Sequence, residues 1–225
     1  MNPSLLPIIP AVDDILFNFA QSDDFWANLA TAFGTSYDVV KATELRNQWQ
    51  SRNFSQLPPI EVLSGEVLGT AKGAYAVSTN KIYLSESFLN VASSESLVKV
   101  ILEEIGHYVD AQINPVDTPV DEGEYFAKVV LNQPLTEAEI TRLKTENDQA
   151  VVVIDGQLVQ IEQAITLVGK WDYFSYAYGV TVVGNYAYLA LTLPIIKEIY
   201  LPPSNRLDQL RSFWSLTSEK ILNKA

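Results

Sequence analysis

The segment from Glu95 to Ile113 constrains the fold of this chain more than any other part of the sequence. It follows Ser93 and Ser94, either of which can cap a helix, and it precedes Pro115, which cannot continue one. The segment is therefore predicted to be a helix that packs one face against a core. Apolar residues at helical spacing define that face: Val98, Ile101, Leu102, Ile105 and Val109.

The other side of this predicted helix carries the only histidine of the chain, among acidic residues. Each helical residue turns by about 100°. Glu103, His107 and Asp110 therefore lie within an arc of roughly 60°. Side chains four residues apart converge on one point above a helix, which is the spacing that zinc sites use. Glu104 lies beside that arc, where a general base would stand next to a metal-activated water.

The remaining patterns predict an α+β fold for residues 1–163, mostly helical with a small antiparallel sheet. Strand patterns at residues 151–154 and 158–161 flank Asp155-Gly156, a favoured hairpin turn. Thr136 and Glu139 form a predicted capping box at the start of a helix. The other predicted elements are helices over 11–31, 36–49 and 125–131, and strands over 60–64 and 81–85.

The sequence changes character after Gln163. Residues 167–172 and 180–190 have a strand–turn–strand pattern that resembles a repeat of the LVIVD-type β-propeller blade. A propeller needs four or more blades, and no second copy is present. We therefore expect a partial blade over residues 164–200 and a helical tail over residues 201–225.

Charge and composition exclude several classes of function. The 225-residue chain has a net charge of −12, whereas nucleic acids and anionic membranes both require basic surface on their partners. The absence of cysteine excludes disulfides, thiolate catalysis and iron–sulfur clusters. No uncharged apolar run approaches the roughly 20 residues of a membrane span, and no basic region of a Sec signal peptide is present. We expect no nucleic-acid partner, no membrane span, and a location that is either cytoplasmic or reached by leaderless export.

The run Glu103-Glu104-Ile105-Gly106-His107 is similar to the His-Glu-x-x-His helix of the zincin metallopeptidases, with glutamate at the first histidine position. Zincins also place the edge strand of their substrate cleft before this helix, where residues 80–85 stand here. Asp121–Ala127 resembles the helix that carries the third metal ligand in gluzincins, the lethal-factor-like branch above all. A similar domain recurs in large cyanobacterial proteins beside haemolysin-type calcium repeats. The resemblance covers about residues 11–163.

This resemblance implies a role for each polar residue of the motif. His107 would be a metal ligand, and Glu104 the base that takes a proton from water. The third ligand is either Glu122, which matches the pairing in thermolysin-like enzymes, or Glu124, which matches the Glu-x-x-Ala pattern. Asp110 would be a carboxylate that orients the His107 ring.

Glutamate at the first ligand position, Glu103, changes the metal chemistry that the resemblance implies. One imidazole with two carboxylates forms a harder and more anionic site, which tolerates Mn²⁺ or Ca²⁺ better than a two-histidine site does. The added negative charge also makes the metal a poorer Lewis acid. We expect Zn²⁺, with Mn²⁺ and Ca²⁺ as alternatives, and catalysis that is weak or absent.

Two functions remain open on these grounds. The first is a metal-dependent peptidase that acts on a peptide or protein; the second is an inactive zincin-derived binding or structural module of a larger secreted or surface protein. The acidic loop over residues 117–124 could instead bind calcium, although it lacks EF-hand spacing. A Ser–His–Asp triad is disfavoured because no Gly-x-Ser-x-Gly elbow is present. The sequence predicts no oligomeric state.

Overall fold

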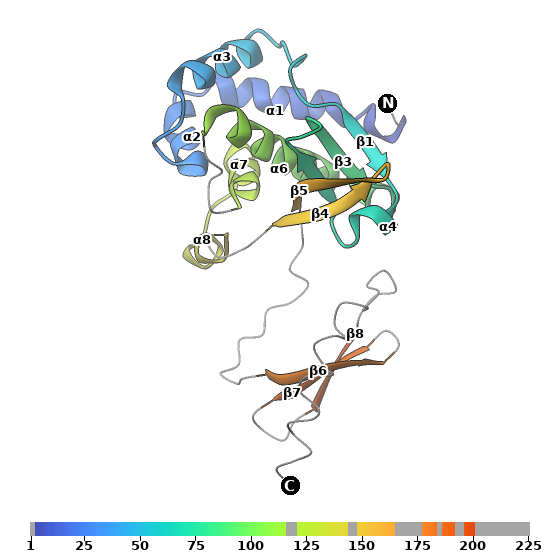
Figure 1. Ribbon diagram of the computed structural model, residues 1–225. Helices are drawn as coiled ribbons and strands as arrows, with labels where there is room; N and C mark the ends of the chain where they lie inside the picture. The colour runs from blue at the N-terminus through green and yellow to red at the C-terminus, as the bar shows by residue number, and fades with distance from the viewer. Residues whose placement is uncertain are drawn as a thin grey trace. The chain divides into compact units, whose positions relative to one another are not determined.

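The computed structural model describes residues 3–115, 121–143, 148–164, 177–183, 186–191 and 196–200. The chain divides into two compact units, Met1–Thr166 and Leu167–Ala225. The first unit combines helices with a five-stranded sheet, so the predicted α+β class is confirmed. Figure 1 shows the longer helices of this unit on one side and the sheet on the other, with the short helix α4 (Gly65–Leu68) beside the sheet.

The N-terminal region forms two helices where one was predicted. Helix α1 (Ile9–Gln21) ends at Ser22, whose backbone is extended, with φ −62° and ψ 141°. The Ser22 hydroxyl accepts a hydrogen bond from the Asp24 N–H at 3.1 Å, just before α2 (Phe25–Phe33) begins. A single helix over residues 11–31 is therefore wrong, because a local side-chain bond competes with the helical backbone at this point.

Helix α1 and the short 3-10 turn Pro3–Leu5 belong to a stretch with the composition of a membrane span. Among the described residues, Pro3–Gln21 is long and apolar enough to cross a membrane by length and composition alone. In the fold, Leu5, Val12 and Leu16 of this stretch are buried in the core. The stretch is 33% buried in the fold, so it contributes one face to the core.

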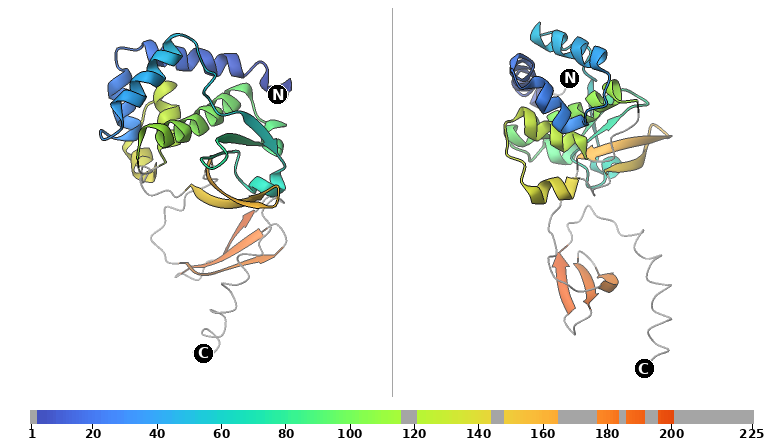
Figure 2. Two further views of the ribbon diagram at one scale, coloured as in Figure 1. Left: turned by 45° about the horizontal axis from the view of Figure 1, so that its top comes forward. Right: turned by 90° about the vertical axis from the view of Figure 1, so that its left-hand side faces the viewer.

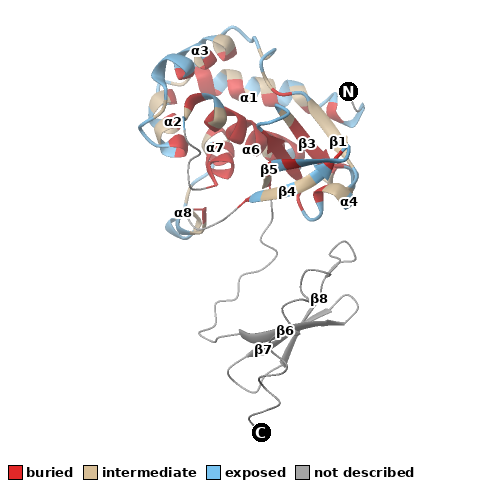
Figure 3. Cartoon of the chain, in the orientation of Figure 1, coloured by how far each residue is buried: buried red, intermediate tan, exposed pale blue. Residues whose placement is uncertain are grey.

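Helix α6 (Ser94–Ile113) is the centre of the first unit. The Ser93 hydroxyl caps it by accepting the Ser96 N–H at 3.1 Å, and Asn114 follows its last turn. It contacts α1 and α3 (Val39–Gln50) on one side and the sheet on the other, as the views in Figure 2 show. Because the middle of α6 is enclosed from both sides, Glu103, Glu104, His107 and Asp110 are buried together with its predicted core face. Figure 3 shows this buried stretch of the helix.

Helix α7 (Glu122–Val130) packs against α6, and the aromatic side chain of Phe126 joins it to α1, α2 and α3. The Phe126 ring lies 5.7 Å from Phe19, 5.6 Å from Phe33 and 6.2 Å from Trp49, measured between ring centroids. All four rings are buried. Packing of this kind fixes the position of α7, and it brings the acidic first turn of the helix to the polar side of α6.

Three short helices complete the first unit: α4 (Gly65–Leu68), α5 (Glu86–Leu89) and α8 (Glu137–Leu143). The predicted capping box at the start of α8 is confirmed. The Thr136 hydroxyl accepts the Glu139 N–H at 3.3 Å, while the Glu139 carboxylate accepts the Thr136 N–H at 3.0 Å.

The sheet has the strand order β1-β3-β2-β5-β4 and is mixed rather than antiparallel. Strand β1 runs parallel to β3, and the other neighbouring pairs are antiparallel. The strands are β1 (Ile60–Leu63), β2 (Gly73–Ala76), β3 (Lys81–Ser85), β4 (Gln149–Ile154) and β5 (Gln157–Ala164).

The tight connection between β2 and β3 explains why β3 lies in the interior of the sheet. Since β2 folds back directly on β3, it takes one side of that strand, and β1 can pair only on the other side. The Ile82 N–H donates to the Pro59 carbonyl at 3.1 Å at the start of that pairing. Strand β3 is therefore interior, whereas the resemblance implied an edge strand at this position.

The predicted hairpin is confirmed and forms one edge of the sheet. Asp155 and Gly156 both have positive φ, 51° and 79°, as a two-residue type I′ turn requires. Strand β5 also pairs with β2 through the register Tyr75↔Glu162 and Gly73↔Ala164. This pairing holds the far end of the hairpin against α6.

The second unit contains a three-stranded antiparallel sheet of β6 (Ala177–Val183), β7 (Tyr186–Leu191) and β8 (Ile196–Tyr200). The expected strand at residues 167–172, the aromatic residues 171–176 and the helical tail over 201–225 lie outside the described residues. The partial blade therefore stays a prediction.

Candidate metal centre

Four carboxylates from three separate segments surround the buried ring of His107. Asp121 and Glu122 come from the start of α7, Asp148 precedes β4, and Glu162 lies on β5. Two sets of donor atoms lie within 4.8 Å of one another: those of His107, Glu122 and Glu162, and those of His107, Asp121 and Asp148. These residues form a buried histidine–carboxylate cluster that could bind a metal ion.

Two glycines allow α6 and α7 to approach closely enough to build this cluster. A Cβ added at Gly106 would lie 2.8 Å from the Cα of Gly123, so the two helices touch through their backbones. A Cβ added at Gly123 would lie 2.4 Å from Nε2 of His107. Carbon atoms do not pack at such distances. The His107 ring therefore packs directly on the backbone of Gly123, where no side chain could be accommodated without displacing the ring.

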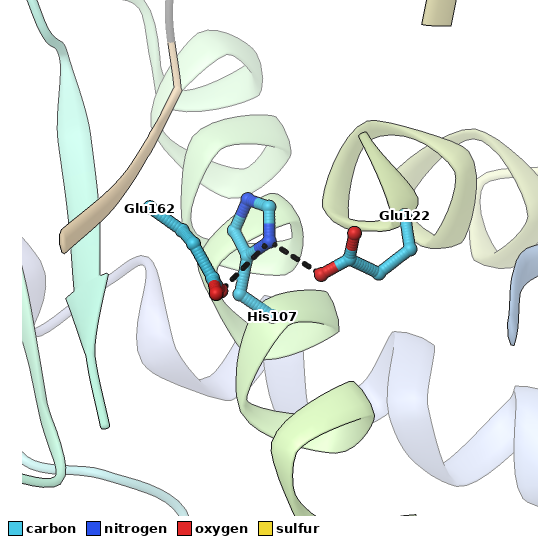
Figure 4. Close-up of side chains that lie close together, drawn as sticks. All are labelled: His107, Glu122 and Glu162. Carbon is cyan, nitrogen blue, oxygen red and sulfur yellow. Dashed lines mark hydrogen bonds and ion pairs between the residues drawn. The ribbon is translucent and has the colours of Figure 1, made fainter. Parts of the chain in front are cut away.

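The two nitrogens of the His107 ring have different surroundings. Nδ1 lies 2.9 Å from Oε1 of Glu122 and 3.3 Å from Oε2 of Glu162. Figure 4 shows both carboxylates approaching this same nitrogen, Glu122 from α7 and Glu162 from the sheet. Ionised carboxylate oxygens accept hydrogen bonds, so in the tautomer with the proton on Nδ1 the ring donates a hydrogen bond to Glu122.

Nε2 of His107 is the nitrogen left with a lone pair when Nδ1 carries the proton. It is buried and has no hydrogen-bond partner among the described residues. Oδ2 of Asp148 lies 3.5 Å from it. Two ligand atoms of a tetrahedral zinc ion, each about 2.1 Å from the metal, are about 3.4 Å apart. The spacing of Nε2 and Oδ2 therefore fits two ligands of one cation, and Asp121 belongs to the same set.

The cluster holds more acidic groups than one imidazole can balance. Burial raises the pKa of Glu122 to about 7, although the hydrogen bond with His107 acts in the opposite direction. Burial alone lowers the pKa of His107, but the bond to Glu122 and the nearby carboxylates raise it well above its usual range. Burial also raises the pKa of Asp121. The cluster therefore retains protons to unusually high pH, and a cation would replace them.

Glu103, the predicted first ligand, lies one helical turn before His107 and is buried. Neither set of converging donor atoms within the described residues includes it. Burial, together with the nearby charges of Asp121 and Glu124, raises the pKa of Glu103 to about 8. The structure thus places Glu103 beside the cluster, in the field of its acids, and not within ligand distance of His107.

Glu104, the predicted base, is completely buried and faces the sheet. Its Oε1 accepts the Ala164 N–H at 3.2 Å, and a Cβ added at Gly73 would lie 2.7 Å from the same atom. Its Oε2 has no hydrogen-bond partner among the described residues. Burial raises its pKa well above the usual range, while the charge of His107 acts to lower it. Glu104 is enclosed by β2 and β5 rather than facing a cleft.

The structure separates the two candidates for the third ligand. Glu122 contacts His107, whereas Glu124 forms ion pairs with Arg142, Lys99 and Lys128. Burial acts to raise the pKa of Glu124, but these cations hold it below the usual range. Glu124 therefore belongs to a charged network on the other side of α7.

Asp110, predicted to orient the His107 ring, accepts a hydrogen bond from the Asn114 side chain at 2.5 Å. The carboxylate that holds the ring is that of Glu122. Asp110 lies one turn further along α6, and its charge contributes to the raised pKa of Glu122.

Three members of the cluster were not among the residues singled out as ligands: Asp121, Asp148 and Glu162. Asp121 belongs to the acidic loop and begins the segment that resembles the gluzincin helix, but neither pattern predicts it as a ligand. Glu162 carries a signal that could have identified it, because it is the only charged residue of β5. Asp148 gives no such signal, since an acidic residue before a strand is ordinary.

Comparison with known proteins identifies no relative: no family model, curated protein or solved structure matches this chain.

Proposed function

We propose that the first unit is a divalent-cation-binding module, with the cation held by Nε2 of His107 and by the carboxylates of Asp121 and Asp148. The observation that carries this proposal is the buried Nε2 atom, which has no hydrogen-bond partner among the described residues and lies 3.5 Å from Oδ2 of Asp148. Burying a polar atom without a partner costs free energy, and a metal ion would remove that cost. Glu122 holds the ring in the required tautomer.

The burial of the cluster favours a structural site over a catalytic one. His107, Asp121 and Asp148 are 0%, 3% and 7% exposed. Structural zinc sites are closed by protein ligands, whereas catalytic sites keep a position open to water and substrate. The cation would join α6, α7 and the start of β4, three segments far apart in the sequence, and so stabilise the first unit.

Zn²⁺ is the metal that this donor set fits best. An imidazole nitrogen suits Zn²⁺ and does not suit Ca²⁺, and the two carboxylates neutralise the charge of a divalent ion. Mn²⁺ also accepts mixed nitrogen and oxygen ligands, so it is the closest competitor. Competition between the three metals at equal concentration would rank them.

Metal analysis of the purified protein tests the proposal. After dialysis, wild-type protein should retain about one Zn²⁺ per chain, and His107→Ala and Asp148→Asn should each lose it. Asp155→Asn is the matched control, because Asp155 lies exposed in the hairpin turn and its positive φ accommodates asparagine. A His107→Ala protein that keeps a full equivalent of Zn²⁺ would overturn the assignment, as would a wild-type protein that keeps none.

A second candidate function is a metal-dependent peptidase, and one observation favours it. Glu104 is a buried carboxylate next to the cluster, and its Oε2 lacks a hydrogen-bond partner among the described residues. In this case Glu104 accepts a proton from the attacking water. Strand β5 would have to move away from α6 to admit a substrate, because the Ala164 N–H now binds Glu104.

Cleavage of an unstructured protein substrate distinguishes the two functions. A peptidase should show zinc-dependent cleavage that Glu104→Gln abolishes, and Glu103→His should increase it by restoring an imidazole at the first position of the motif. A closed structural site predicts no cleavage by wild type or by Glu103→His. Cleavage that persists in Glu104→Gln would come from a contaminating protease and would leave the peptidase without support.

A further inference from the structure

A groove of about 390 Å³ opens at the surface where β2 and β5 separate. The two strands pair up to Tyr75↔Glu162 and then diverge. Val77, Gln149 and Gln160 of the groove are exposed, so it is open to solvent. Its lining consists of residues from the end of β2 and from the β4–β5 hairpin: Tyr75, Val77, Ser78, Gln149, Gln160, Ile161 and Glu162.

Glu162 joins this groove to the buried cluster. It lines the groove, and its Oε2 lies 3.3 Å from Nδ1 of His107. The Glu162 side chain is 16% exposed, compared with 0% for His107 and 2% for Glu122. Glu162 is therefore the most exposed carboxylate in contact with the histidine, and one side chain spans the distance between solvent and the cluster.

A second residue of the groove, Gln149, lies next in the chain to a residue near Nε2 of His107. Gln149 pairs with Glu162 across the hairpin and directly follows Asp148 in the chain. Asp148 in turn lies 3.5 Å from Nε2 of His107. The groove therefore meets the cluster at Glu162 and beside Asp148, the two carboxylates that approach the His107 ring from the sheet.

We propose that this groove is the entrance through which a divalent cation reaches His107, and that Glu162 is the carboxylate that first receives it. The inference rests on the proposed cation site. A negatively charged group at the inner end of a groove attracts cations and raises their rate of entry. The side-chain oxygens of Ser78, Gln149 and Gln160 can replace part of the hydration shell on the way.

Rates of Zn²⁺ uptake by chelator-stripped protein test the entrance. The probe is Zn²⁺ itself, and its transfer from a weak fluorescent chelator is followed by stopped flow at low ionic strength. Gln160 is exposed and is not a ligand, so its charge can be changed without altering the site. Gln160→Lys should slow uptake by about threefold and Gln160→Glu should accelerate it by about as much, since a single charge acts on a divalent ion at short range.

Gln157→Lys is the matched control, because Gln157 is exposed on the same strand but does not line the groove. It should leave the rate unchanged, and Glu162→Gln should slow uptake. The proposed entrance would be wrong if the two Gln160 variants took up Zn²⁺ at equal rates, or if Gln157→Lys slowed uptake as much as Gln160→Lys does. Neither result would contradict the cation site itself. The final amount of Zn²⁺ bound is read separately: a wild-type protein that binds none overturns the site and the entrance together.

Discussion

At the scale of single residues, the two nitrogens of His107 decide what the cluster can do. Nδ1 is committed to Glu122 at 2.9 Å, and Nε2 has no hydrogen-bond partner among the described residues. A carboxylate that holds one nitrogen of a histidine fixes the tautomer and makes the other nitrogen a better ligand. This arrangement favours an orienting role for Glu122, whereas the resemblance offered it, beside Glu124, as a candidate for the third ligand.

Separate substitution of Glu122 and Glu124 by glutamine tests which of the two glutamates supports the metal-binding His107. Glu122→Gln should weaken Zn²⁺ affinity about 10- to 100-fold, as is typical when a carboxylate that supports a metal-binding histidine is lost. Glu124→Gln should leave the affinity unchanged, because Glu124 pairs with Arg142 and Lys99. Titration by isothermal calorimetry measures both. Equal losses in the two variants would contradict the distinction drawn from the structure.

The residues of the cluster could be predicted from the sequence only in part. The spacing on α6 identified His107, and the resemblance to the gluzincin helix offered Glu122 and Glu124 as alternatives, of which Glu122 belongs to the cluster. Asp148 and Glu162 lie 41 and 55 residues after His107, and only the folding of the hairpin onto α6 brings them to the ring. No local pattern encodes such an approach.

At the scale of secondary structure, the crossing of α6 and α7 is the contact on which the cluster depends. Gly106 and Gly123 face each other at this crossing, and any side chain at either position would force the helices apart. Phe126 fixes α7 on its core side, because its three aromatic neighbours belong to α1, α2 and α3.

Two alanine substitutions at this crossing should differ in their effect on metal binding. Gly106→Ala and Gly123→Ala should each lower the free energy of unfolding by about 1–3 kcal/mol, because each overpacks the interface. Gly123→Ala should also abolish Zn²⁺ binding, since its Cβ would lie 2.4 Å from Nε2 of His107. Urea denaturation and metal analysis measure the two effects.

Gly65→Ala serves as the control for these variants. Its nearest neighbour is the flexible side chain of Ser87, 3.0 Å from the added Cβ. If Gly123→Ala bound Zn²⁺ as wild type does, the close approach of α6 and α7 would not be needed to form the metal site.

At the scale of the whole molecule, the buried acids make stability depend on pH. The pKa of Glu103 is raised from 4.5 to about 8 and that of Glu122 to about 7, so the folded chain holds protons that the unfolded chain releases. The raised pKa of His107 has the same sign. The free energy of unfolding of the cation-free protein should therefore fall as the pH rises from about 5 to about 8.

Urea midpoints at pH 5 and pH 8, measured with a chelator and then with Zn²⁺, test this dependence. Because a cation binds the unprotonated groups, the stabilisation by Zn²⁺ should increase over the same range. Glu103→Gln should flatten the profile of the cation-free protein. A midpoint that rises with pH in the presence of chelator would contradict the raised pKa values.

The sequence by itself determined the local structure of this protein. The boundaries of α6, the turn at Asp155-Gly156 and the Thr136–Glu139 capping box are each set by residues close together in the chain, and all three were predicted. The tertiary structure alone decided that β3 is interior, that the polar face of α6 is buried, and which carboxylates meet at His107. The physical reason is range: turns and caps depend on neighbouring residues, whereas a buried charge cluster depends on segments that only the packed core brings together.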